Sequence, residues 1–240
     1  MTYQAGGTVF APRTISDEYW LLSHHDYDGK KLVDDEVLQI GLAGAVLAEL
    51  MLAGRLDIVD KRVMVRDARP VGDPVLDVVT SMIGNTRQIL SPMKWVQQVS
   101  DSEYNLGDQR GAKPISLTDA VGRRLQAAGL VEEQQVRGMF RTTTRLVPVS
   151  WQGAAAPAIR IGYYLGRLNE MDTETRVLAK LALIVGLDGQ IGAGYPFPVK
   201  PAIEAACREL YPNPIGHEVL STLLDGVDRA VAAVALRVRR

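Results

Sequence analysis

Apolar and small residues fill the stretch from Val37 to Leu52 almost without interruption, and only Gln39 and Glu49 break the run. Asp34 precedes this stretch as a plausible N-cap, and Gly54 follows it as a residue suited to the left-handed conformation that ends a helix. A helix that is apolar nearly all round is typical of the centre of a bundle. The pattern therefore predicts a central, buried helix.

The spacing of apolar residues changes from 3.6 to 2 after this helix. Leu56 and Ile58 point to one face of a strand, and Val63 and Val65 can pair with them across a turn at Asp60-Lys61. The sequence predicts a β-hairpin attached to the end of the helix.

A second unit with the same order follows later in the chain. Ser116 is the expected N-cap of a helix that stops at Gly129, and two β-rich runs flank Arg137-Gly138 as a second hairpin. The repeated helix and hairpin is better explained as a common structural unit than as a functional duplication. It does resemble a winged helix, so DNA binding has to be weighed.

The remaining segments are mostly helical. Residues 1–13 show no periodicity and predict a flexible arm, and Ser16 is the expected cap of a short helix. The glycine- and proline-rich segment from Gly186 to Lys200 predicts a long loop. Pro214 starts the last helix, whose expected inward residues are Ile215, Val219, Leu223, Val227, Val231 and Val234. We expect one compact, mainly α domain over residues 14–240, with two winged-helix-like β-hairpins.

Composition narrows the function classes. The chain is 47% hydrophobic and 23% charged with a net charge of −1, so nothing in its overall charge attracts nucleic acid. No apolar run approaches the roughly 18–20 residues of a membrane span, and the N-terminus lacks the pattern of a signal peptide. The single Cys207 excludes an internal disulfide and fits a reducing compartment. These features predict a cytoplasmic protein.

Candidate catalytic and metal-binding groups are few. The carboxylates of residues 34–36 point apart on a helix and are explained by its first turn, and His24-His25 lack the spacing of a metal site. Cys207 has no neighbouring histidine that would make it a nucleophile. The glycines at 189, 192 and 194 lack the Lys-Ser or Lys-Thr of a phosphate-binding loop. We therefore expect no enzymatic activity, no metal and no cofactor.

Basic residues gather in three short groups. These are Lys30 with Lys31, Arg110 with Lys113, and Arg137 with Arg141 and Arg145. Each alone is typical of a solvated surface. If two of the groups converge on one face, a phosphate-headed lipid becomes a reasonable ligand.

The run GLAGAVLAELMLAGRLDIVDKRVMVRDARPVGDPVLD resembles the signature region of the Golgi phosphoprotein 3 family, including its actinobacterial members. RRLQAAGLVEEQ with its hairpin, and MDTETRVLAKLALIV, extend the resemblance to nearly the whole chain. The resemblance implies a mostly helical domain, peripheral on membranes. Eukaryotic members bind phosphatidylinositol 4-phosphate and act as adaptors for glycosyltransferase tails. It also implies self-association through the hairpin from Leu130 to Val149.

The lipid pocket of those relatives uses a Trp, an Arg and two further basic residues. Aligned with this chain, these positions fall near Asp34, on Ala43, and near Ile115 and Thr118, so none is retained, and Trp20 and Trp95 lie elsewhere. From adjacent loops, the candidates for an anion or lipid contact are Lys30, Lys31, Arg110 and Lys113.

The leading hypothesis is a non-enzymatic, peripheral membrane-associated protein at the inner membrane face that contacts an anionic phospholipid headgroup and forms a homo-oligomer. The alternatives are a protein-interaction adaptor that does not depend on lipid and, third, a winged-helix DNA binder. An exposed apolar patch would be the structural sign of the protein-interaction adaptor.

Overall fold

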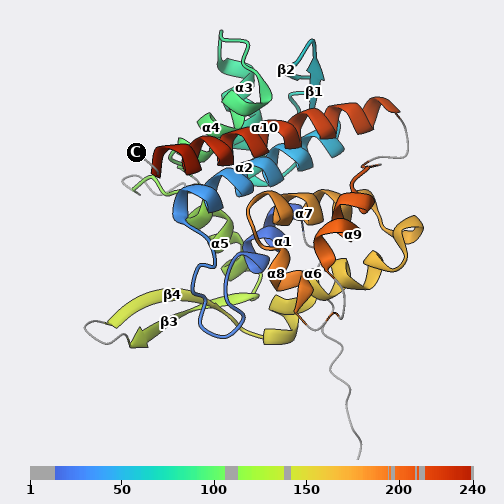
Figure 1. Cartoon of the computed structure of the whole chain (residues 1–240). Coiled ribbons are helices and arrows are strands. Elements are labelled where there is room, and N and C mark those ends of the chain that lie inside the picture. The colour runs from blue at the N-terminus through green and yellow to red at the C-terminus, as the bar shows by residue number, and fades with distance from the viewer. Residues whose placement is uncertain are drawn as a thin grey trace, which may run out of the picture.

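The helix α2 (Asp35–Leu52) forms the centre of the protein. In the computed structural model, which describes residues 14–105, 113–137, 142–193, 195, 198–208, 210 and 214–238, every residue from Ile40 to Met51 is buried. Helices α1, α4, α7 and α10 pack around it (Figure 1). Asp34 occupies the N-cap position, although its side chain makes no capping hydrogen bond, and Gly54 follows the helix with a φ of +67°. The prediction of a central buried helix is confirmed.

The other elements surround α2 as one mainly helical domain with two two-stranded antiparallel hairpins, which confirms the predicted fold class. Among the described residues no helix is both long enough and apolar enough to cross a bilayer. In chain order the elements are α1 (Ile15–Leu22), α2, β1 (Leu56–Val59), β2 (Arg62–Val65), α3 (Pro74–Asn85), α4 (Pro92–Asp101), α5 (Leu117–Ala127), β3 (Val131–Arg137), β4 (Thr142–Pro148), α6 (Trp151–Leu165), a 3₁₀ turn η1 (Leu168–Glu170), α7 (Thr173–Ile184), α8 (Asp188–Gly192), α9 (Val199–Ala206) and α10 (Pro214–Val238).

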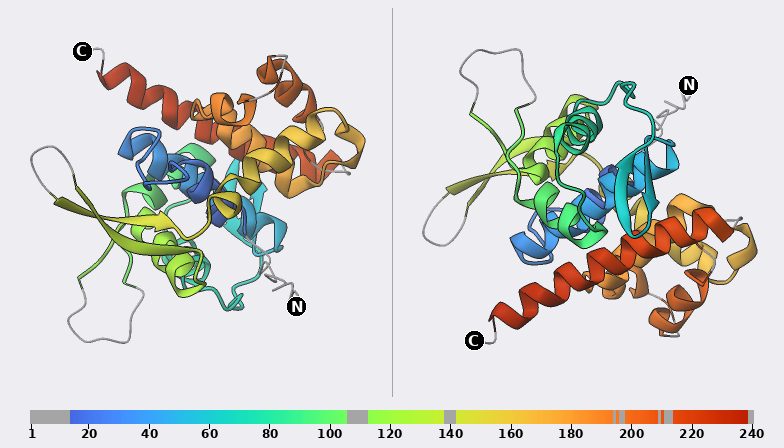
Figure 2. Two further views of the ribbon diagram at one scale, coloured as in Figure 1. Left: turned by 90° about the horizontal axis from the view of Figure 1, so that it is seen from below. Right: turned by 90° about the horizontal axis from the view of Figure 1, so that it is seen from above.

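Both predicted hairpins are present, and the first has the predicted pairing, whereas Gly138 in the predicted turn of the second lies outside the described residues. In the first, Leu56 lies opposite Val65 and Ile58 opposite Val63. The turn residues Asp60 and Lys61 have φ values of 50° and 60°, as a type I′ turn requires. In the second, β3 and β4 pair from Val131 with Pro148 out to Arg137 with Thr142. The β3–β4 hairpin projects from the body away from α7–α9 (Figure 2).

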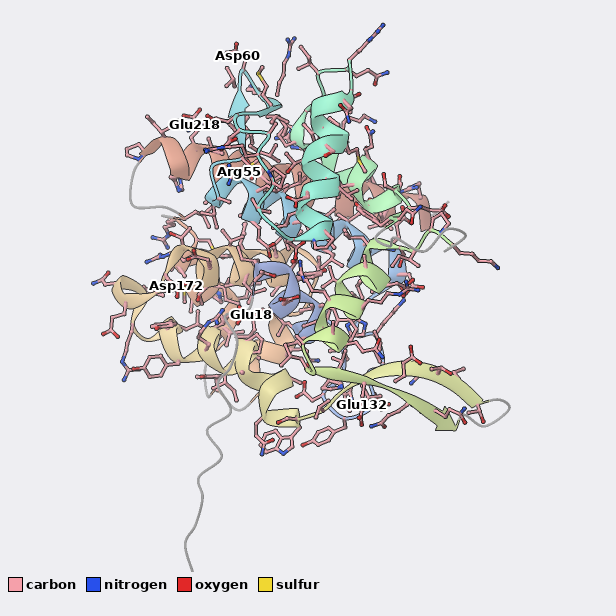
Figure 3. The ribbon with its side chains drawn as sticks, turned by 180° about the vertical axis from the view of Figure 1, so that it is seen from behind. Glu18, Arg55, Asp60, Glu132, Asp172 and Glu218 are labelled. Carbon is pink, nitrogen blue, oxygen red and sulfur yellow. The ribbon has the colours of Figure 1, made fainter. Side chains whose placement is uncertain are left out.

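Helix α1 is more central than the sequence indicates. All eight of its residues are buried, and it contacts α2, α5, α6 and α7. The prediction that Ser16 caps this helix is wrong: Thr14 is the N-cap, in a capping box with Asp17, and Ser16 lies inside the helix. The buried Glu18, near the middle of the molecule in Figure 3, is ion-paired with Arg160 of α6. Burial of the polar side chains Ser16, Asp17 and Glu18 is possible because each has a partner, whereas the buried Tyr19 hydroxyl has none among the described residues.

Two further predictions in the C-terminal half are corrected. The segment from Gly186 to Lys200 is not one long loop, because it contains α8 and the start of α9, and Ile191 of α8 is buried in the core. In α10, Leu223, Val227 and Val234 are buried and Val219 and Val231 pack against the core, as predicted. Ile215, in contrast, is 77% exposed, at the edge of a hollow that it lines together with Met51 and Leu52 of α2. The predicted arm at residues 1–13 lies outside the described residues.

Candidate functional site

A hollow of about 730 Å³ lies between the loop that follows α1, the start of α5 and strand β4. We call it the cationic hollow. It is lined by Trp20, His24, Gly29, Lys30, Lys31, Asp35, Ile115, Thr118, Asp119, Arg123, Gln126, Glu133, Thr143, Thr144, Arg145 and Leu146. Its cations come from three separate segments, so only the tertiary fold brings them together.

The loop carrying Lys30 and Lys31 is fixed by a close backbone contact. Gly29 has a φ of +61°, and a Cβ at this position would lie 2.0 Å from the carbonyl oxygen of Leu146 in β4. Only glycine allows both the left-handed conformation and this approach. A bridge between His24 and Lys31 closes the base of the loop. The contact holds the two lysines next to the strand that carries Arg145.

An aromatic stack forms the base of the hollow. The rings of Trp20 and His24 lie 3.8 Å apart and nearly parallel, and Trp20 Nε1 donates to the carbonyl of Thr118 at 3.1 Å. His24 Nδ1 lies 2.7 Å from the carbonyl oxygen of Trp20, which can only accept, so Nδ1 carries the proton. Burial lowers the pKa of His24 to about 4. His24 is therefore neutral near pH 7 and contributes no positive charge.

Three of the cations form no direct ion pair with a described residue, although Arg145 lies close enough to Asp28 to interact with its charge. Lys30, Arg123 and Arg145 form no ion pair with any residue that the structure describes, whereas Lys31 Nζ is bound to Asp35 at 2.6 Å. Three carboxylates, from Asp35, Asp119 and Glu133, also line the hollow. The hollow thus offers free positive charge together with acceptors for hydroxyl groups.

Helix α5 contributes its first turn. Ser116 caps the helix by accepting from the backbone N–H of Asp119 at 3.1 Å, and Gln39 of α2 accepts from the backbone N–H of Thr118 at 3.2 Å. The Thr118 hydroxyl is different: the residue is 5% exposed, and its oxygen has no hydrogen-bond partner among the described residues. A buried hydroxyl without a partner costs free energy, and because this oxygen has almost no exposed surface it is a feature of the packing and not an open ligand contact.

The structure brings together only some of the basic residues that the sequence proposes for an anion or lipid contact. Lys30 and Lys31 line the hollow, Lys113 is exposed and does not line it, and Arg110 lies outside the described residues. Arg145, from a second basic group, joins the two lysines, so two of the three groups do converge. Trp20, set aside in the sequence, lines the hollow as well.

Other residues of the hollow were missed. Arg123 and Gln126 were not among the sequence candidates for an anion contact, although their spacing of three residues on one helix face was an available signal. Thr118 gave no signal, because nothing in the sequence shows that its hydroxyl is buried without a partner.

The structure shows the surroundings of the side chains considered for catalysis, namely Cys207, Asp35 and Glu36. Burial raises the pKa of Cys207 to about 11, so its thiol is protonated near neutral pH. Asp35 is paired with Lys31, and Glu36 is paired with Arg237 of α10. No group of three or more metal-ligating side chains occurs within the part of the chain that the structure describes. The arrangement suits recognition of a charged ligand.

A mainly helical domain with two helix-and-hairpin units, and a hollow rich in free cations beside the second, defines a class of binding protein. The chain belongs to the Golgi phosphoprotein 3 (GPP34) family, whose model matches residues 15–234. The family resemblance seen in the sequence is therefore confirmed, and the bacterial branch stays a prediction. A search of curated proteins found no match.

Proposed function

We propose that this protein is a non-enzymatic, peripheral membrane-associated protein that holds the phosphorylated headgroup of an anionic lipid in the cationic hollow. Membership of a family of peripheral membrane adaptors supports this function. The observation that carries it is the convergence of Lys30, Arg123 and Arg145, none of them in a direct ion pair with a described residue, around one hollow.

The contacts match a phosphate linked to a polar ring. A phosphate accepts charge-assisted hydrogen bonds from Arg and Lys, and Lys30, Arg123 and Arg145 can donate them here. A volume of about 730 Å³ exceeds what one phosphate needs and leaves room for a headgroup that carries hydroxyls. Asp119 and Glu133 are then placed to accept from hydroxyls.

The same carboxylates argue against strong selectivity for a headgroup with several phosphates. Asp35, Asp119 and Glu133 repel additional negative charge, and none of the pocket residues of the eukaryotic relatives is expected to be retained. We therefore expect binding to anionic lipids in general, with at most a small preference for phosphatidylinositol 4-phosphate.

Vesicle sedimentation tests the proposal. The full chain is incubated with vesicles of phosphatidylcholine alone, or with added phosphatidylserine, phosphatidylinositol or phosphatidylinositol 4-phosphate. We expect it to sediment with the anionic vesicles and not with the neutral ones. The double variant Lys30→Gln/Arg145→Gln should bind about thirtyfold more weakly, since each basic group near the surface contributes about 1 kcal/mol.

The matched control is Arg62→Gln/Arg87→Gln, two exposed arginines that form no ion pair with a described residue. Arg62 lies next to Asp60, at the opposite end of the molecule from Glu132 of β3 (Figure 3). This control should bind as the parent protein does. Equal losses in both double variants would show only a general charge effect and would reject the hollow as the site.

The assay also separates the alternatives. Negligible sedimentation with every vesicle, together with a stable protein partner, would favour the lipid-independent adaptor. Salt-sensitive retention by random duplex DNA would favour the nucleic-acid binder, which the net charge of −1 disfavours.

We also propose that the segment from Leu130 to Val149 mediates self-association. The side chains of residues 132–135 of β3 are exposed along the outer part of the hairpin. Sedimentation velocity of the full chain tests this proposal, and a single monomeric species at tens of micromolar would contradict it.

A further inference from the structure

Helix α6 turns large apolar side chains to the outside. Trp151, Ile159 and Tyr163 are 48%, 59% and 50% exposed. Their spacing of eight and four residues places them on one face of the helix, with Ala155 between the first two. A surface helix of a globular protein usually presents polar residues on this side. This apolar face of α6 therefore needs an explanation.

The apolar face of α6 adjoins the cationic hollow. Trp151 follows shortly after β4, whose residues 143–146 line that hollow. Tyr27, which is 67% exposed, lies on the loop that Gly29 fixes against β4. His24 lines both the cationic hollow and a second hollow of about 400 Å³ that reaches Ile159. In the left panel of Figure 2, seen from below, α6 and the β3–β4 hairpin both lie on the near side.

The chemistry of this side matches a membrane interface. Trp and Tyr favour the headgroup layer, and Arg and Lys can extend from it toward lipid phosphates. Arg167 lies 4.4 Å from the ring centre of Tyr163, so a cation borders the face here, while Lys30 and Arg145 border it on the side of the hollow. Of the acidic residues on the loop, Asp26 is partly buried, and Asp28 lies 3.1 Å from His25 Nδ1 and close enough to Arg145 to interact with its charge.

We infer that α6 lies along the surface of an anionic membrane and inserts Trp151, Ile159 and Tyr163 into the boundary between headgroups and acyl chains. This inference rests on the proposed headgroup function and adds a second, apolar contact to it. The cationic hollow selects charged lipid, and the α6 face supplies the area that keeps the protein on the bilayer.

Tryptophan fluorescence tests the insertion directly. The chain has three tryptophans, of which Trp20 and Trp95 are 2% and 0% exposed, so Trp151 is the one that a membrane can reach. Anionic vesicles with brominated acyl chains should quench its emission, whereas unbrominated vesicles should shift the emission to shorter wavelength. Trp151→Phe removes the exposed fluorophore and should lose both signals.

A pair of variants measures the contribution of the face. Ile159→Thr removes apolar surface at a largely exposed position and should weaken binding to anionic vesicles about three- to tenfold. Val59→Thr makes a similar change beside Asp60, at the far end of the molecule, and should leave binding unchanged. Circular dichroism of both variants checks that the fold is retained.

The outcomes separate the two proposals. Sedimentation with anionic vesicles without quenching of Trp151 would overturn the insertion and leave headgroup binding standing. No sedimentation at all would reject headgroup binding, and the insertion with it. Unchanged binding of Ile159→Thr would show that the α6 face has another occupant, such as a protein, and would also overturn the insertion.

Discussion

Replacing Arg124 with Met should destabilise the protein strongly, because this side chain connects three helices. Arg124 belongs to α5 and is ion-paired with Asp17 of α1 at 2.8 Å and with Asp73, the N-cap of α3, at 2.7 Å. It also donates to the hydroxyls of Thr14 at 3.0 Å and Ser16 at 2.7 Å. Its side chain is 19% exposed, so water replaces these contacts poorly.

The magnitude follows from the groups left behind. Arg124→Met keeps most of the side-chain volume and removes the cation shared by Asp17 and Asp73, whose side chains are 12% and 20% exposed. Loss of one partner from a buried ion pair costs about 3–5 kcal/mol. For a chain of this size that free energy lowers the melting temperature by roughly 6–20 °C. Arg124→Lys should give a smaller loss, since an ammonium cannot reproduce the planar fork.

Arg123→Met is the matched control. Arg123 is the next residue of the same helix, is exposed, and has no ion pair with a described residue. Its replacement should change the free energy of unfolding by no more than about 0.5 kcal/mol while weakening vesicle binding. Urea unfolding followed by circular dichroism measures the free energies, and sedimentation measures binding. If Arg124→Met unfolds at the same urea concentration as Arg123→Met, the argument from the buried network is refuted.

Three further predictions concern stability. Burial raises the pKa of Glu49 from 4.5 to about 7, so the folded state holds its proton more tightly and loses stability as pH rises from about 4.5 through 7. Glu49→Gln should therefore raise the melting temperature at pH 8 and not at pH 4.5; a gain of equal size at both would contradict this. Gly41→Ala places a Cβ 2.0 Å from the buried Tyr19 hydroxyl and should cost about 1–3 kcal/mol in urea unfolding, whereas an unchanged midpoint would mean that the core adjusts. Asp172→Ala removes the cap that accepts from the Thr175 N–H at 2.6 Å and should cost about 1 kcal/mol by the same measurement, with no loss as the contrary result.

Local patterns predicted much of the fold. The apolar run after Asp34 gave the central helix, and alternation on both sides of Asp60-Lys61 gave the register of the first hairpin. The cap of α1 was misplaced because Thr14 and Ser16 are both good N-caps in sequence. What decides between them is tertiary: the Ser16 backbone N–H donates to Glu49, and its hydroxyl contacts Arg124.

The candidate site was predicted only in part. The sequence identified Lys30 and Lys31 as basic and grouped Arg145 with other arginines, and it stated what their convergence would mean. Their meeting depends on the backbone contact between Gly29 and Leu146, residues more than a hundred positions apart. The neutral state of His24 depends on burial beneath Trp20. Neither fact leaves a local pattern in the sequence.

The position of α1 has a consequence for synthesis on the ribosome. Its eight residues are among the first of the domain to emerge, yet one of the helices that enclose it, α7, ends only at Ile184. Only α2 is close to α1 in sequence, and the sides of α1 that α5, α6 and α7 cover stay open until those helices are made. Contacts this distant in sequence form slowly, so the burial of α1 is completed only after α7 has been made.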